Sequence, residues 1–124
     1  MAQDVLSNLA ELLAGFKAMG GIEAALITSL GGINMVSLVP PRTNADTLAA
    51  MSSTLQNAGD FITTQFKKGH SNRIVVECEH SKLVIICAGP KAYFIVLTLD
   101  NVNLGPLFLE MSNTAKKIEQ LLNT

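Results

Sequence analysis

Two histidines and two cysteines are the residues whose side chains could hold a metal ion: His70, His80, Cys78 and Cys87. Zinc sites usually draw such ligands from closely spaced pairs. Here the cysteines are well separated, and the histidines fall in expected turns far apart in the chain. We therefore expect no metal site and interpret both histidines as surface residues.

The two cysteines lie on neighbouring expected strands that are joined by a turn near His80. In that hairpin Cys78 would face a residue near Leu83, and Cys87 would lie roughly 10 Å farther along its strand. This separation exceeds the reach of a disulfide. We interpret both cysteines as reduced core thiols of a cytoplasmic protein.

Patterns typical of nucleophilic or phosphate-binding sites are missing from the sequence. No Walker lysine follows Gly20-Gly21 or Gly31-Gly32, and Ser29 lies in no Gly-x-Ser-x-Gly motif. Glu77 and Glu79 alternate onto one face of an expected strand. They could form a carboxylate pair, but charges that protect a sheet edge from aggregation explain them equally well. We expect no catalytic site.

The totals narrow the class of protein. The chain has 124 residues, of which 48% are hydrophobic and 15% charged, with a net charge of −1. This length predicts one domain over residues 1–124. The absence of a basic stripe disfavours a nucleic-acid binder. No apolar run is long enough to span a membrane, and Asp4 stands where a signal peptide would be basic, so we expect no membrane insertion and a cytoplasmic location.

Five expected strands differ in how apolar their two faces are. The segments Ala24–Ile27, Leu83–Ala88 and Tyr93–Leu99 are apolar on both faces, so they belong inside a sheet that is covered on both sides. The segments Ile33–Val39 and Arg73–Glu79 are half polar and belong at its edges. Short connections predict antiparallel neighbours. The strand order 2-1-5-4-3 keeps these hairpins intact and places the half-polar strands at the edges.

Three helices are expected, over Asp4–Lys17, Ala45–Lys67 and a last segment that begins near Asn103 or Gly105. Each has a stripe of apolar residues at helical spacing that should face the core. In the long middle helix this stripe is Leu48, Met51, Leu55, Ile62 and Phe66. The element order α-β-β-α-β-β-β-α then predicts an α/β/α three-layer sandwich around an antiparallel sheet, profilin/longin-like, with the terminal helices on one face and the long helix on the other.

The opposite face of the long helix is the best candidate for a contact surface. Its residues are small and nearly uncharged, whereas a solvated face, the alternative interpretation, normally carries more Lys and Glu. A glycine inside a helix costs about 1 kcal/mol relative to alanine, so close approach of another backbone would rationalise Gly59. The predicted contact residues on this helix are Ala45, Ala49, Ser52, Ser53, Gln56, Gly59, Asp60 and Thr63.

Three segments carry a resemblance to a known family. Ile22-Glu-Ala-Ala-Leu-Ile-Thr-Ser-Leu-Gly-Gly-Ile33 looks like a first hairpin, Ala45 to Phe66 lies at the place of a long helix, and Asn103-Leu-Gly-Pro-Leu-Phe-Leu-Glu-Met111 looks like the start of a final helix. In this order and spacing, the chain from Gly20 onward resembles the roadblock / dynein light-chain (roadblock/LC7) family.

The resemblance implies a homodimer or heterodimer. Members of the family pair the third strand edge to edge and lay their two long helices side by side. On this chain the implied strand contacts are Arg73, Val75, Glu77 and Glu79. The family provides scaffolds for small Ras-like GTPases and dynein-associated subunits, and some bacterial members stimulate GTP hydrolysis by a polarity GTPase. No cofactor is implied.

We therefore expect a non-enzymatic dimeric scaffold or regulator that binds a small Ras-like GTPase. Two alternatives stay open: an adaptor similar to the dynein light chains, and a small-ligand sensor, because related sandwich folds carry ligand pockets. Arg42 and Arg73 are the only arginines. Neither stands out as an arginine finger, and Arg42, in an expected loop, is the one to test.

Overall fold

The structure is a computed structural model that describes residues 2–123. Within these residues the elements follow the expected order. They are α1 (Ala2–Ala18), β1 (Ile22–Ser29), β2 (Asn34–Leu38), α2 (Ala45–Gln65), β3 (Arg73–Glu77), β4 (Lys82–Cys87), β5 (Ala92–Thr98) and α3 (Leu104–Leu122). The third strand ends two residues earlier than expected, because the Cys78 amide donates to the Ser81 carbonyl (2.8 Å) and starts a tight turn.

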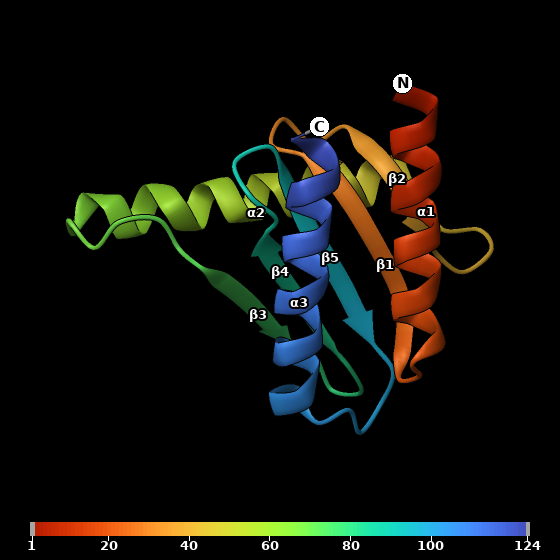
Figure 1. Ribbon diagram of the computed structural model, residues 1–124. Helices are drawn as coiled ribbons and strands as arrows, with labels where there is room; N and C mark the ends of the chain where they lie inside the picture. The colour runs from red at the N-terminus through yellow and green to blue at the C-terminus, as the bar shows by residue number, and fades with distance from the viewer. Residues whose placement is uncertain (1, 124) are drawn as a thin grey trace.

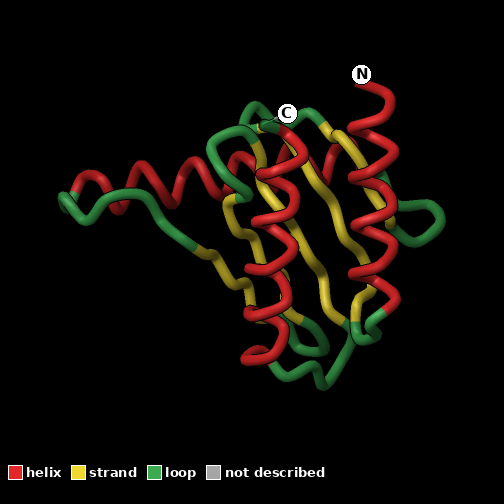
Figure 2. The backbone as a smooth tube through the Cα atoms, in the orientation of Figure 1, coloured by secondary structure: helices red, strands yellow, loops and turns green. Residues whose placement is uncertain are grey.

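The five strands form an antiparallel sheet in the order β2-β1-β5-β4-β3, as predicted. Figure 1 shows α1 and α3 side by side on one face and α2 crossing the other. The three layers are equally clear in the backbone trace of Figure 2. The predicted α/β/α sandwich is therefore confirmed, and β1, β4 and β5 lie inside the sheet.

The face under α1 and α3 carries the larger core. It is built from the predicted stripes of the two terminal helices, and Leu9, Leu13, Met111 and Ile118 are completely buried. The rings of Phe16 and Phe94 meet edge to face, with their centroids 5.0 Å apart and their planes at 75°. Aromatic pairs prefer this arrangement because the positive edge of one ring meets the negative face of the other.

The face under α2 is different, and the predicted orientation of this helix is wrong. The predicted core stripe of Leu48, Met51, Leu55, Ile62 and Phe66 is exposed, whereas the residues buried against the sheet and the β1–β2 turn are Ala49, Ser52, Ser53 and Gln56.

Short side chains face the sheet because α2 lies very close to the strand connection beneath it. A Cβ atom on Gly32 would lie only 3.1 Å from the Cα of Ala50. The Ser53 hydroxyl donates to the Leu30 carbonyl over 2.6 Å, so this buried polar group keeps a hydrogen-bond partner. Longer apolar side chains on this face would push the helix away from the turn.

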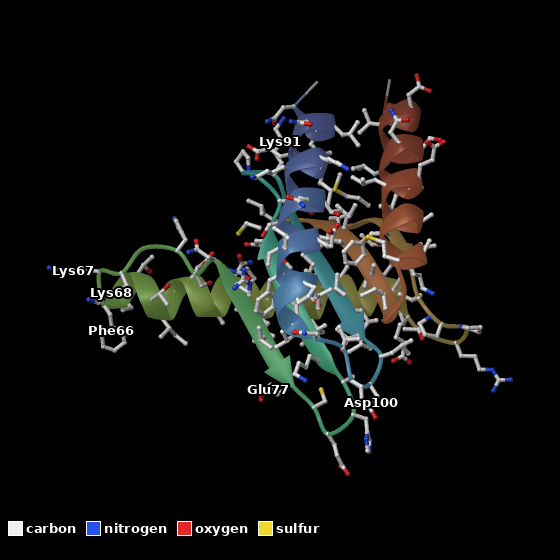
Figure 3. All side chains as sticks on the ribbon, turned by 60° about the horizontal axis from the view of Figure 1, so that its bottom comes forward. Phe66, Lys67, Lys68, Glu77, Lys91 and Asp100 are labelled. Atoms are coloured by element: carbon white, nitrogen blue, oxygen red, sulfur yellow. The ribbon has the colours of Figure 1, made fainter. Side chains whose placement is uncertain are left out.

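The second half of α2 extends past the β3 edge of the sheet, and the chain then returns through residues 66–72 to begin β3 (Figure 1). We call this projecting part of α2, together with residues 66–72, the arm. Figure 3 shows Phe66, Lys67 and Lys68 at its outer end, pointing away from the sheet. The arm therefore presents side chains that the protomer itself does not cover.

The interpretation of the cysteines is half correct. Both are free, but both are exposed rather than part of the core. Cys78 lies in the turn after β3, and Cys87 is the last residue of β4. Within residues 2–123, none of the helices has both the length and the apolar character required to span a bilayer.

Candidate interaction surface

The exposed apolar side of α2 is the main candidate surface. We call it the α2 seam: Leu48, Met51, Leu55, Ile62 and Phe66. Positions 48, 55 and 62 repeat with the heptad spacing that packs one helix along another. Met51, Ile62 and Phe66 are 61%, 57% and 72% exposed. Large apolar side chains gathered on one exposed side of a helix often mark an interaction site.

The free edge of β3 lies on the side of the sheet where the second half of α2 projects (Figure 1). β3 pairs with β4 on one side, and no described strand lies on its other side. The Arg73 guanidinium lies over the Phe108 ring, 3.8 Å from its centroid, which ties the start of β3 to α3. Val75 packs against the larger core, and Glu77 is exposed. The edge is thus held in place while its backbone groups remain available for pairing.

A polar network joins the arm to the start of β3. The Asp60 Oδ1 atom accepts hydrogen bonds from the Ser71 amide (2.7 Å), the Ser71 hydroxyl (2.7 Å) and the Gln56 amide nitrogen (3.2 Å). The Gln56 amide nitrogen also donates to the Ser71 carbonyl (3.1 Å) and hydroxyl (2.7 Å). We call Gln56, Asp60 and Ser71 the Asp60 network. Gln56 is fully buried, and its Oε1 atom has no hydrogen-bond partner among the described residues.

The Asp60 network changes the titration of nearby groups. Burial raises the pKa of Asp60, but hydrogen bonds from Ser71 and Gln56 and the positive potential of His70 outweigh it, so the net pKa lies below its ordinary value. The His70 Nδ1 atom is 3.8 Å from the carboxylate. Burial and the charge of Asp60 raise the pKa of the Cys87 thiol. Burial and the charges of Cys87 and Asp60 raise the pKa of Tyr93. The Tyr93 hydroxyl donates a hydrogen bond to the Asn57 Oδ1 atom over 2.7 Å.

The residues predicted as contacts occupy three kinds of place. Ala49, Ser52, Ser53 and Gln56 are buried inside the protomer; Ala45, Gly59, Asp60, Thr63 and Val75 are partly buried; and Arg73, Glu77 and Glu79 are exposed. The expected open face of α2 is therefore turned toward its own sheet and loop. Gly59 is explained by Ile74, since a Cβ on Gly59 would lie 2.9 Å from the Ile74 Cδ1 atom. That the remaining residues contact a partner stays a prediction.

The α2 seam was missed as a surface, although its sequence signal was visible. The same apolar stripe was assigned to the core, because a stripe at helical spacing does not say which neighbour covers it. The seven-residue spacing of Leu48, Leu55 and Ile62 fits a helix that packs on a sheet as well as one that packs along another helix, so it does not separate the two interpretations.

The structure also has hollows that a small molecule could enter. One of them, of about 260 Å³, lies between the end of α1 and the start of α3, and Phe16, Met19, Val102, Leu107 and Glu110 are among its lining residues. It opens on the surface and touches neither the α2 seam nor the free edge of β3. Among the described residues, no three His, Cys, Asp or Glu side chains are grouped so that they could hold a metal ion.

Comparison with known proteins agrees with this architecture. The family model described as Roadblock/LC7 domain matches residues 9–98. The chain belongs to the Roadblock/LC7 family. The match covers most of α1, the whole sheet and α2, so it contains both the α2 seam and the free edge of β3.

Individual proteins and solved structures are also similar to this chain. Uncharacterized protein MJ1340 of Methanocaldococcus jannaschii is 28% identical over 82% of this chain and 88% of its own length. A Roadblock/LC7 domain from Streptomyces avermitilis superposes with a TM-score of 0.86 at 24% identity, over 93% of this chain and 98% of that one. MglB of Myxococcus xanthus superposes with a TM-score of 0.88 at 10% identity, over 95% and 90%. At these identities the two solved structures show a shared fold.

Proposed function

We propose that this Roadblock/LC7 chain is a dimeric, non-enzymatic scaffold or regulator of a small Ras-like GTPase in the cytoplasm. Family membership supports the class of function. The observation that carries the proposal is the exposed α2 seam beside the free edge of β3. A monomer would leave both in water, and burying exposed apolar area gains roughly 25 cal/mol per Å².

In the proposed homodimer, the seams of two α2 helices pack along each other and two β3 strands pair at their free edges. A two-fold axis makes both contacts with the same surfaces of the two copies. The measurement is light scattering after gel filtration at micromolar concentration. A mass of two chains is expected, and a mass of one chain would contradict the homodimer.

The proposed docking surface for the GTPase is the side of α2 that neither the sheet nor the second helix would cover. It carries Ala50, Thr54 and Phe61, which share one helical face and are exposed. Phe61 is 66% exposed, and buried aromatic anchors often dominate binding energy. Retention of a GTP-loaded Ras-like GTPase from the same source is expected in a pull-down, with loss of retention on Phe61→Ala. Retention by the variant would show that this surface is wrong.

Whether the complex accelerates GTP hydrolysis is a separate test. Arg42 is exposed and has a positive φ of 67° in the turn closed by the Thr43 amide and the Pro40 carbonyl (3.3 Å). We expect the residues of the GTPase to carry the chemistry, so Arg42→Ala should leave any acceleration unchanged in a GTPase assay. A loss of acceleration without a loss of binding would instead assign Arg42 a role in hydrolysis.

A further inference from the structure

The two parts of the proposed dimer surface lie on different elements. The seam belongs to α2, the edge belongs to β3, and residues 66–72 connect them. Beyond Gln56, α2 buries no side chain completely. The angle between the seam and the edge is therefore set by the few contacts that bridge the arm and the start of β3. The inference that follows rests on the homodimer proposed above.

Three sets of contacts bridge that gap. Within the Asp60 network, Gln56 and Asp60 bind both the backbone and the side chain of Ser71, which lies two residues before β3 begins. The Thr63 hydroxyl donates to the Gly69 carbonyl over 2.7 Å and fixes the middle of the loop. Gly59 lets Ile74 approach the helix to a distance that a Cβ atom would not allow. Of these contacts, the Asp60 carboxylate receives the most hydrogen bonds.

We propose that Asp60 is a positioning residue: by holding Ser71, it keeps the free edge of β3 and the α2 seam in the relative orientation that a second copy recognises. Without the carboxylate, the Ser71 amide loses its acceptor and the loop gains conformational freedom. That freedom has to be lost again when two copies associate, which weakens binding even when each protomer remains folded. Asp60 acts through Ser71, so the effects of substituting the two residues should be less than additive.

The test compares Asp60→Ala and Ser71→Ala, singly and together, with two matched variants. Thr54→Ala removes a hydroxyl from the same helix that bonds only to the Ala50 carbonyl of its own helix (2.9 Å). Ser71→Thr keeps both the hydroxyl and the amide, so it should retain the dissociation constant and the exchange rates of the wild type. Two quantities are measured: the dimer dissociation constant by sedimentation, and amide hydrogen exchange over residues 66–77 in dilute protein. Circular dichroism confirms that each variant is folded.

Asp60→Ala should weaken the dimer about tenfold. Ser71→Ala should weaken it less, because the Ser71 amide still donates to the Asp60 carboxylate. The effect of the double variant should be smaller than the sum of the two single effects, because the bond from the Ser71 hydroxyl to Asp60 is lost in both. Exchange over residues 66–77 should become faster in both, while Thr54→Ala and Ser71→Thr stay at the wild-type values. An unchanged exchange rate in folded Asp60→Ala would overturn the inference, and so would faster exchange with an unchanged dissociation constant.

The two proposals can fail separately. If the wild-type chain is a monomer at all accessible concentrations, the homodimer is wrong and its recognition by a second copy goes with it. The exchange measurement needs no dimer. It would still decide whether Asp60 holds the start of β3 against α2.

Discussion

The two faces of the sheet are built in opposite ways. Under α1 and α3, most of the large apolar side chains point inward, and the helix sides that face water carry mainly polar or small residues, with Leu6 and Leu109 as exceptions. Under α2, the inward residues are short or polar, and the large apolar residues point outward. The first face satisfies its helices within one protomer. The second leaves the most apolar side of its helix for something outside it, which indicates that α2 contributes to the fold and to assembly with different faces.

The largest effect should come from the larger core. Leu13 of α1 is fully buried, so Leu13→Ala should lower the free energy of unfolding by about 3 kcal/mol through lost burial and the cavity left behind. Urea denaturation measures this change. The dissociation constant of the folded dimer should not move, because Leu13 lies on the opposite side of the sheet from the seam.

Neighbouring residues of α2 offer the sharpest comparison. Gln56→Arg should lower the free energy of unfolding by about 2 kcal/mol, because it places a charge where a hydrogen-bonded amide was fully buried. Leu55→Arg, one position earlier on the seam, should leave unfolding of the dilute chain nearly unchanged but abolish the dimer. The measurements are urea denaturation and sedimentation. If Gln56→Arg folded normally and lost a partner instead, the original assignment of the two helix faces would be restored.

A milder change on the seam should affect association alone. Ile62→Ala removes part of an apolar side chain that is 57% exposed in the protomer. In the dimer this should weaken association about tenfold, equivalent to roughly 1.4 kcal/mol. The matched control is Thr54→Ala on the outward face. Equal effects of the two variants in sedimentation would indicate that the seam is not the contact.

The smallest effect is expected from pH. The pKa of Asp60 is lower in the folded chain than its ordinary value of 3.8, so the stabilisation it provides is complete above that value and is lost as the pH falls through the folded one. The groups nearby are His70, Cys87 and Tyr93. Asp60→Asn should remove this part of the acid dependence. The measurement is the free energy of unfolding at a series of pH values below 4, and an unchanged slope in the variant would contradict the assignment.

Most of the fold could be predicted because its strands and terminal helices obey local rules. The strands β4 and β5, which contain Ile85 and Val96, are apolar on both faces, and this pattern already predicts that they lie inside a covered sheet. The apolar stripe of α1, which includes Leu9, Leu13 and Phe16, predicts the side of this helix that packs against the sheet. α2 could not be oriented in this way, because its polar residues find partners that are distant in sequence: Ser53 at the Leu30 carbonyl and Gln56 at Ser71.

The candidate surface was less predictable than the fold for the same reason. An apolar stripe shows that a helix side leaves water, but the stripe is identical whether a sheet of the same chain or a helix of another covers it. The cysteines illustrate a related limit. The strand pattern predicts that Cys87 points into the core, whereas the residue ends β4 and is exposed.

Because α2 uses different faces for folding and for assembly, the two properties can evolve independently. Replacing Ile62 or Phe66 disturbs little inside the protomer, whereas replacing Ala49 or Gln56 disturbs the packing that holds the helix down. Partner specificity and stability of the protomer are therefore encoded on separate sides of one helix. New pairings, including heterodimers of duplicated chains, can arise without a loss of folding.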